Sequence, residues 1–227
     1  MRKAIAFLLV ATVGAAFYVV LGHIPFGEDK IDVANHYIQN GVRETGAVNI
    51  VTSVVVTYRG FDTLGEVTIL FIAAVGIGAV LFTEKKARDE EPKQKASLIV
   101  QTGTNLLFPF ILLTGVYVFI HGHLTPGGGF QGGAVIASGY LLLYLTWPDW
   151  RINRRRFNAV ESLSGLAFVV LGVLGITYGM GFLANFLPLG TPNTLFSAGI
   201  IPIIYIAIGL KVGSELAGIV GNLMERE

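Results

Sequence analysis

Cysteine is absent from this sequence of 227 residues, and charged residues make up only 14% of it. The absence of cysteine excludes a disulfide framework, a thiolate metal site and a cysteine-ligated iron–sulfur cluster. We therefore expect a chain that carries no electrons itself and has neither a cofactor nor a catalytic site of its own. The formal net charge is +1, so the charge balance gives no indication of a nucleic-acid partner, and we expect none.

Hydrophobic residues, in contrast, make up 53% of the sequence, and its mean hydropathy is +0.66. A membrane-spanning helix needs about 20 mostly apolar residues. Six stretches meet or nearly meet that length: Lys3–Leu21, Asp62–Phe82, Ser97–Ile120, Phe130–Trp147, Val160–Met180 and Leu195–Val212. The first resembles a signal peptide, but its apolar run is long and ends in no clear cleavage site, so we interpret it as a retained span. The sequence predicts an all-α integral membrane protein whose helices lie in a lipid bilayer.

The basic residues are distributed unevenly among the segments that connect these stretches. Two connecting segments, Gly122–Gly129 and Gly181–Thr194, contain no Lys or Arg. Most of the basic residues lie at the N-terminus or in two other connections: Arg2, Lys3, Lys85, Lys86, Arg88, Lys93, Lys95, Arg151, Arg154, Arg155 and Arg156. Because basic residues favour the cytoplasmic side of a membrane, we predict six spans in the cell membrane, with both termini in the cytoplasm.

The polar segment His23–Phe61, between the first two stretches, is too polar to cross a membrane. Apolar residues recur at helical spacing within Gly46–Tyr58: Val48, Val51, Val55 and Tyr58. This spacing predicts an amphipathic helix at the membrane interface, although the Val and Thr content would also suit a strand. Further along, Thr83–Lys95 is highly charged and contains Pro92. It predicts a cytoplasmic linker and a natural boundary between two modules.

A glycine-rich motif separates the third and fourth apolar stretches. It comprises Pro126, Gly127, Gly128, Gly129, Phe130, Gly132 and Gly133. The chain must turn here because Pro126 and the glycines after it cannot continue a helix, and the glycines permit close approach of a second backbone. His121 and His123 precede the turn at a spacing that does not make a helical metal pair, so we expect no metal site. Two compatible interpretations remain: a tight hairpin, or a hairpin that also places protonatable groups at the mouth of an ion path.

Ionisable residues inside the apolar stretches need an explanation, since each costs about 2.5–3.5 kcal/mol at the centre of a spanning helix. Glu66 lies one turn inside the second stretch, with Asp62 four residues earlier on the same helical face. One interpretation is a helix start, with Asp62 as N-cap and Glu66 close to water. The other is a buried Glu66 carboxylate whose desolvation allows it to load and unload protons.

The last apolar stretch carries Lys211 and Glu215, four residues apart and opposite in sign. With the stretch starting at Leu195, Lys211 lies about 22 Å into the helix. The pair could neutralise itself, with Lys211 extending to the cytoplasmic surface. Alternatively, Lys211 is one station of a proton relay. We interpret Glu161, at the start of the fifth stretch, as an interfacial charge.

Two stretches resemble a known transporter family. Residues Gly122–Gly133 resemble the signature of the B-type subunit of Mrp-type multisubunit cation/proton antiporters, and Tyr58–Glu66 resembles the end of the large A-type subunit of that complex. The resemblance covers roughly residues 1–90 as an A-like piece and 91–227 as a four-span B-like piece. Such a fused chain is similar to the antiporter module of complex I-like respiratory complexes, including archaeal membrane-bound hydrogenases and sulfane sulfur reductases.

The resemblance implies a membrane protein that contributes to coupled Na⁺ and H⁺ translocation. It implies other antiporter-type membrane subunits as partners, together with iron–sulfur and nickel-site hydrophilic subunits, and it places Glu66 in a lateral chain of polar groups. Two departures stand out: the family usually has Asn where Leu124 and Thr125 stand, and its last span carries an Asp that Phe196–Gly199 lacks. A component of a redox-driven pump is therefore favoured over a stand-alone antiporter.

The ion-path candidates are thus Glu66, Asp62, Lys211, Glu215, His121 and His123. The alternative is a purely structural subunit, whose small residues, such as Gly209 and Gly213, pack against neighbouring helices. An intramembrane protease is excluded by the residue inventory, which offers no cysteine and no paired aspartates at depth.

Overall fold

The computed structural model describes residues 2–23, 31–83 and 96–224. The predicted linker therefore lies, in its residues 84–95, outside the described residues. Every regular element in the described ranges is a helix, and this confirms the all-α class. The chain divides into two compact units, Met1–His36 and Tyr37–Glu227.

The first unit contains the apolar helix α1 (Arg2–Gly22) and the beginning of α2 (Ile31–Thr45). The side chains described in α1 are exposed, although Phe7, Leu8 and Val10 are as apolar as core residues. A helix that is hydrophobic on all sides is typical of a membrane span, because lipid replaces the core of a soluble protein. Helix α2 carries the acidic Asp32 in its first turn and the basic Arg43 in its last turn, an order that suits the helix dipole.

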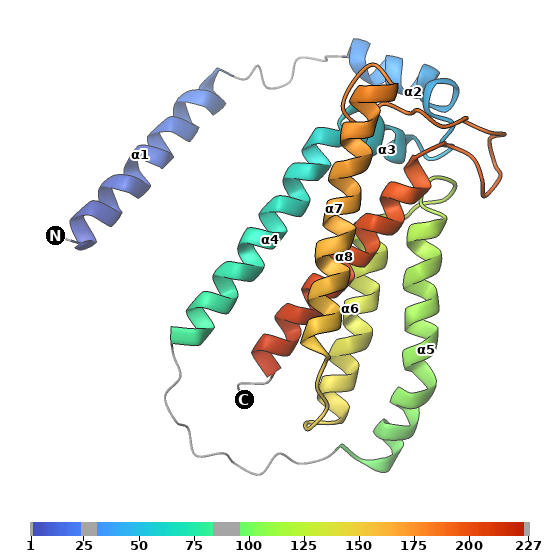
Figure 1. Ribbon diagram of the computed structural model, residues 1–227. Helices are drawn as coiled ribbons and strands as arrows, with labels where there is room; N and C mark the ends of the chain where they lie inside the picture. The colour runs from blue at the N-terminus through green and yellow to red at the C-terminus, as the bar shows by residue number, and fades with distance from the viewer. Residues whose placement is uncertain (1, 24–30, 84–95, 225–227) are drawn as a thin grey trace. The chain divides into compact units, whose positions relative to one another are not determined.

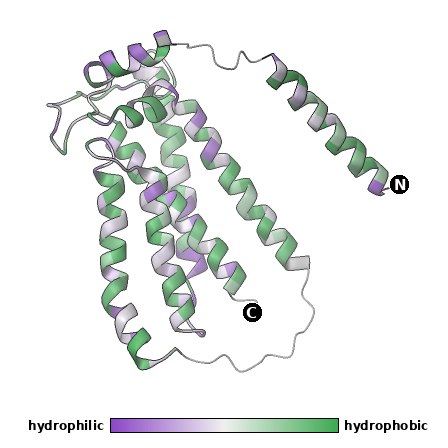
Figure 2. Cartoon of the chain, turned by 180° about the vertical axis from the view of Figure 1, so that it is seen from behind, coloured by the Kyte–Doolittle hydropathy of each residue, from purple (hydrophilic) through white to green (hydrophobic). Residues whose placement is uncertain are grey.

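The second unit is a helical bundle built around its last helix (Figure 1). Its elements are α3 (Ile50–Thr52), the π-helix η1 (Ser53–Tyr58), α4 (Gly60–Thr83), α5 (Leu98–Ile120), α6 (Gly129–Thr146), α7 (Arg154–Tyr178) and α8 (Ile201–Met224). Helix α8 packs against α4, α5, α6, α7 and η1. Of the 18 consecutive residues that make up its most apolar part, 61% are buried, whereas in α4 only 6% are. Figure 2 shows that the long helices of this bundle are mainly hydrophobic, as expected of helices in a lipid bilayer.

Five helices, α1, α4, α5, α7 and α8, are long and apolar enough to cross a membrane. Helix α6, which corresponds to the predicted span Phe130–Trp147, has only 18 residues, and Gln131 and several glycines lower its hydropathy. It nevertheless lies along α5 and α8 (Figure 1). The chain is a multi-pass membrane protein, while the count of six spans and the cytoplasmic termini remain predictions.

The last span lies further along the chain than the sequence predicted. Helix α8 begins at Ile201 instead of Leu195 and continues to Met224 instead of Val212. The helix cannot begin earlier because Ala198 and Gly199 have φ angles of 66° and 55°. The Asn185 side chain holds this turn, since its Nδ2 donates to the Ala198 carbonyl at 3.1 Å and its Oδ1 accepts from the Ile200 N–H at 3.2 Å.

The predicted amphipathic helix over Gly46–Tyr58 exists in part, since helical structure begins at Ile50. The segment is a short α-helical turn followed by η1, and Val51 is 67% exposed. The buried side chains are Thr52, Ser53 and Val56. The hydroxyl groups of Thr52 and Ser53 can be buried because they hydrogen bond inside the protein. The side of the segment that packs inside the protein is thus the polar one, while Val51 on the apolar side stays exposed, as an interfacial helix would have it.

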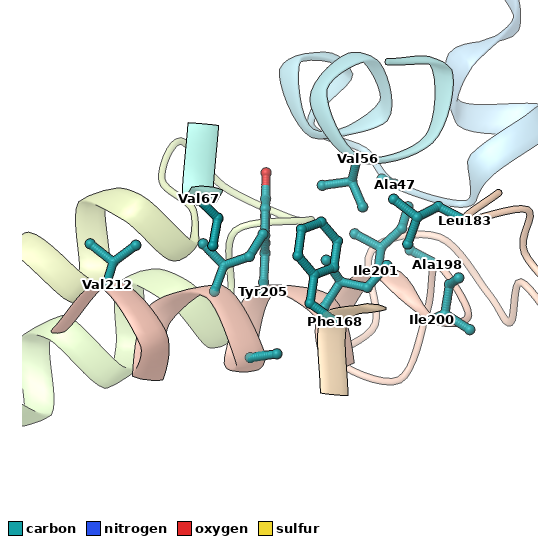
Figure 3. Packing of buried hydrophobic residues seen from close by; sticks show 13 residues of the cluster. Ala47, Val56, Val67, Phe168, Leu183, Ala198, Ile200, Ile201, Tyr205 and Val212 are labelled. Carbon is teal, nitrogen blue, oxygen red and sulfur yellow. The ribbon is translucent and has the colours of Figure 1, made fainter. Parts of the chain in front are cut away.

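The hydrophobic core surrounds the first half of α8. Its members come from Ala47 before α3, from η1, α4 and α7, from the segment before α8 and from α8 itself (Figure 3). Ile204, Ile208 and Val212, which follow one another at helical spacing, are each no more than 1% exposed. Phe168 of α7 and Val67 of α4 complete the core around this stripe. The charged residues of α8 lie just beyond it.

Candidate functional site

Helix α8 carries a buried ion cluster near its middle. The Lys211 ammonium donates to Glu215 Oε2 on the same helix at 2.9 Å and to Glu161 Oε1 on α7 at 3.3 Å. The Lys211 side chain is 9% exposed and the Glu215 side chain 1%, whereas Glu161 is 21% exposed. The three residues define the ion cluster: Glu161, Lys211 and Glu215.

Neighbouring helices enclose the ion cluster with apolar or small residues. The Lys211 ammonium lies 5.1 Å from the centre of the Phe71 ring of α4, a cation–π distance. Gly165 of α7 leaves room for the lysine stem, since a Cβ there would lie 3.2 Å from Lys211 Cδ. Glu215 Oε1 is buried and has no hydrogen-bond partner among the described residues. One carboxylate oxygen is therefore left unsatisfied in the driest part of the cluster.

The position of Lys211 in the helix bears on one part of the first sequence-based interpretation, the extension of its side chain to the surface. Lys211 is the eleventh residue of a helix that starts at Ile201, so about 15 Å of helix precedes it and about 20 Å follows it. It lies mid-helix and pairs with two carboxylates. The predicted neutralising pair with Glu215 is present, whereas extension of Lys211 to the surface does not fit this geometry, and the proton relay stays a prediction. Glu161 was expected at the interface, and its contact with Lys211 was not predicted.

Glu66 and Asp62 lie on the outward face of α4. Glu66 is exposed within the second unit, whereas Thr63 and Val67, on the adjacent side of the helix, are buried. Asp62 lies in the first helical turn and pairs with Arg59 at 2.6 Å, with both side chains more than half exposed. The segment before α4 does not cover Glu66. Burial of this carboxylate would therefore require a helix from outside the second unit.

The two histidines do not converge. His121 ends α5, where its ring stacks on Tyr117 at a centroid distance of 4.2 Å. His123 is 0% exposed, and the backbone of Thr194 and Leu195 lies beside its ring. Neither ring nitrogen makes a hydrogen bond of good geometry with the described residues. Burial lowers the pKa of His123 below its usual 6.5. His123 is thus a neutral, enclosed side chain at neutral pH.

The glycine-rich motif forms the turn and also the contact face of α6. Helix α6 begins at Gly129, so Gly129, Gly132 and Gly133 are helical. A Cβ on Gly132 would lie 2.6 Å from the Gly115 carbonyl of α5, and one on Gly133 would lie 2.8 Å from the Gly213 nitrogen of α8. These distances leave no space for a methyl group. The glycines therefore allow α6 to pack backbone to backbone between α5 and α8.

A set of hydrogen bonds, here called the hairpin clamp, fixes the turn before α6. Asn49 Nδ2 donates to the carbonyls of Gly122 and Thr125 at 2.8 and 2.9 Å, and the Asn49 N–H donates to the His123 carbonyl at 3.1 Å. Thr52 Oγ1 donates to the Gly122 carbonyl at 2.6 Å and lies 2.8 Å from the Tyr205 hydroxyl of α8. The clamp joins the segment before α4 to the hairpin and to α8. It was not predicted, because a lone Asn or Thr in a polar segment gives no signal of a distant carbonyl.

Among residues 2–23, 31–83 and 96–224, no three His, Asp or Glu side chains converge as metal ligands. The chemistry that this part of the chain offers is therefore that of charge in an apolar bundle. Charged side chains in such a place can exchange protons or attract small cations. The ion cluster is the candidate site, and the hairpin clamp fixes the helix that carries it.

Two family models match the chain. A domain related to the MnhB subunit of Na⁺/H⁺ antiporters matches residues 99–218, and the MbhE model, which describes a component of MBH, matches residues 1–96. An uncharacterized protein of Methanocaldococcus jannaschii is 31% identical over 88% of this chain and 87% of its own length. The A/B-type component of a probable K⁺/H⁺ antiporter of Rhizobium meliloti is 27% identical over 67% of this chain, which spans only 18% of that relative.

Two solved structures resemble the whole chain. A chain of the membrane-bound sulfane sulfur reductase, an archaeal respiratory membrane complex, is 46% identical with a TM-score of 0.77, and 98% of each chain is covered. A chain of the Mrp complex from Dietzia sp. is 26% identical with a TM-score of 0.74, and the match covers 98% of this chain but 26% of that one. One relative thus has the length of this chain, while the other contains its fold as a small part.

Proposed function

Because this chain belongs to the family of domains related to the MnhB subunit of Na⁺/H⁺ antiporters, we propose that its ion cluster takes part in coupled Na⁺ and H⁺ translocation. The chain is a membrane subunit of a cation/proton antiporter module, as its resemblance to Mrp-type subunits predicted. The observation that carries the proposal is the buried contact of Lys211 with Glu215 and Glu161. Ionised groups this far inside an apolar bundle are costly and mark ion or proton pathways.

The complex that contains the chain is proposed to be a redox-driven respiratory complex in the cell membrane. The full-length similarity to a chain of the sulfane sulfur reductase supports this assignment over a stand-alone antiporter. The partners would be other antiporter-type membrane subunits and hydrophilic subunits with iron–sulfur or nickel sites, which carry the electrons in place of this chain. Purification of the intact complex tests this point, and a complex without any metal-containing component would contradict it.

The chain is further proposed to consist of two modules that correspond to separate parts of the antiporter. Residues 1–90 would be the piece equivalent to the end of the A-type antiporter protein, and residues 91–227 the piece equivalent to the B-type protein. The two family models, which match residues 1–96 and 99–218, support this division. Under the same proposal, Glu66 is covered by a neighbouring subunit and joins the lateral chain of polar groups.

Transport by the assembled complex in proteoliposomes tests the proposed function. We expect Glu66→Gln and Lys211→Ala each to abolish Na⁺-dependent proton movement, measured with a pH-sensitive dye, while the complex still assembles. Asp149→Asn, which removes an exposed carboxylate elsewhere, is the control and should behave like the unmodified complex. Unchanged transport in Lys211→Ala would refute a role of the ion cluster.

A purely structural subunit is the second candidate function. The backbone contacts of Gly132 with Gly115 and of Gly133 with Gly213 favour it, since they show helices shaped for close packing. In that case Glu66→Gln and Lys211→Ala would lower transport only to the extent that they lower assembly of the complex. The two functions therefore separate when transport is expressed per assembled complex.

A further inference from the structure

The charges of the ion cluster do not balance. Two carboxylates, Glu161 and Glu215, contact the single ammonium of Lys211, so the cluster carries one excess negative charge when all three groups are ionised. Among the described residues, the ion pairs of Glu161 and Glu215 are both with Lys211. The described parts of α5 and α6 contain no Asp, Glu, Lys or Arg, Arg154 of α7 donates to Asn222, and Glu66 of α4 is exposed and acidic.

An uncompensated charge in a water-poor place is unstable, and it is removed by binding a proton or another cation. The structure contains an atom suited to that role. Glu215 Oε1 is buried and has no partner in the described part of the chain, while Glu215 Oε2 already accepts from Lys211. The enclosed Oε1 can therefore carry a proton while Oε2 continues to accept the hydrogen bond from Lys211.

The exposure of the three side chains is graded. Glu161 is 21% exposed, Lys211 9% and Glu215 1%. Both carboxylates touch the same nitrogen, so a proton or cation that reaches Glu161 is one lysine away from Glu215. Glu161 is therefore the entrance of the cluster and Glu215 its enclosed end.

We propose that Glu161, Lys211 and Glu215 form a site that holds one exchangeable monovalent cation, a proton shared by the two carboxyl groups, with Glu161 as its point of entry. The inference rests on the proposed function and extends it to Glu161 and to the occupant. Each exchange breaks an O–H bond on one carboxyl group and forms one on the other carboxyl or on water. No electron is transferred.

Infrared difference spectroscopy of the purified, intact complex tests the proposal, because protonated carboxyl groups have a distinct C=O stretching band. The complex is titrated from acid to alkaline pH in choline chloride, and again in NaCl. The variants are Glu161→Gln and Glu215→Gln, with Glu161→Asp as the conservative change and Asp149→Asn as the control. Size-exclusion profiles verify that each variant is assembled.

We expect one titrating carboxyl band that both Glu→Gln variants remove, and that Glu161→Asp and Asp149→Asn retain. Loss of the band on adding NaCl at constant pH supports the site with Na⁺ as competitor of the proton, and a band that NaCl leaves unchanged supports a site for protons alone. A band that survives in Glu161→Gln, or no titrating band in the unmodified complex, overturns the proposal. Lost transport in Lys211→Ala together with an unaltered band in Glu161→Gln would refute this inference while leaving the proposed function standing.

Discussion

Replacement of Lys211 by methionine tests whether the ion cluster is as dry as its geometry indicates. Methionine retains the apolar stem that passes Gly165 but removes the ammonium that contacts Glu215 at 2.9 Å and Glu161 at 3.3 Å. The Glu215 side chain, only 1% exposed, then loses its single ionic partner among the described residues. Removal of one partner of a buried ion pair costs about 3–5 kcal/mol. We expect Lys211→Met to lower the stability of the assembled protein by this amount.

The matched control is the double variant Lys211→Met with Glu215→Gln, which also removes the carboxylate charge. Replacement of both members of a buried pair is often neutral, so the double variant should recover most of the loss. Thermal unfolding of the purified complex, monitored as the fraction of this chain retained in the complex after heating, measures the difference in stability between the two variants. If Lys211→Met and the double variant unfold at the same temperature as the unmodified complex, water reaches the cluster and the reasoning fails.

Three further outcomes are expected. Gly133→Ala should destabilise the protein by about 1–3 kcal/mol through overpacking, because the new methyl group would meet the α8 backbone. The control Gly218→Ala, at a position with open space around it, should not destabilise the protein. Equal thermal stability of the two variants would contradict the packing of α6 against α8. Asn49→Ala should cost about 1–3 kcal/mol and speed hydrogen exchange in residues 121–128, which would not change if the clamp were dispensable. Burial lowers the pKa of His123, so in acid the unfolded chain binds more protons than the folded one. The stabilisation by neutral His123 should therefore be fully present above about pH 6.5 and be lost as the pH falls below it. His123→Gln should remove this component of the pH dependence of stability.

Composition and hydrophobic run length were sufficient to predict the fold class and the approximate positions of the long helices. Five of the predicted spans correspond to apolar helices, because a membrane imposes length and hydropathy on each segment locally. The start of α8 was misplaced, since the residues before Ile201 are apolar too. What stops that helix is the turn held by Asn185, a contact between segments that no local pattern reveals.

The candidate site was only half predictable for the same reason. Lys211 and Glu215 are four residues apart on one helix, so their contact follows from helical geometry. Glu161 belongs to another helix, and its contact depends on the register of α7 against α8. Charge type and position along the sequence suggested an interfacial residue. The register is set by packing details, including the space that Gly165 leaves for the lysine stem.

The glycine-rich motif and the ion cluster are parts of a single arrangement of α8. Gly209 and Gly213 each lie two residues from Lys211, which places them on roughly the opposite side of the helix. That side is where the α6 backbone approaches, at Gly129 and Gly133. The close packing of α6 and α8 leaves no room for water behind the lysine, so α7 and α4 need only cover the other side.

The structural and transport hypotheses consequently predict the same geometry at the glycines and differ only at the charges. A larger residue at Gly133 would move α8 and change the surroundings of Lys211 without touching any charged group. If transport depends on a dry ion cluster, Gly133→Ala should weaken coupling per assembled complex, and Gly218→Ala should not. If the chain is only a spacer, loss of transport in Gly133→Ala should follow loss of assembly in strict proportion, because no ion would then depend on the interior of the bundle.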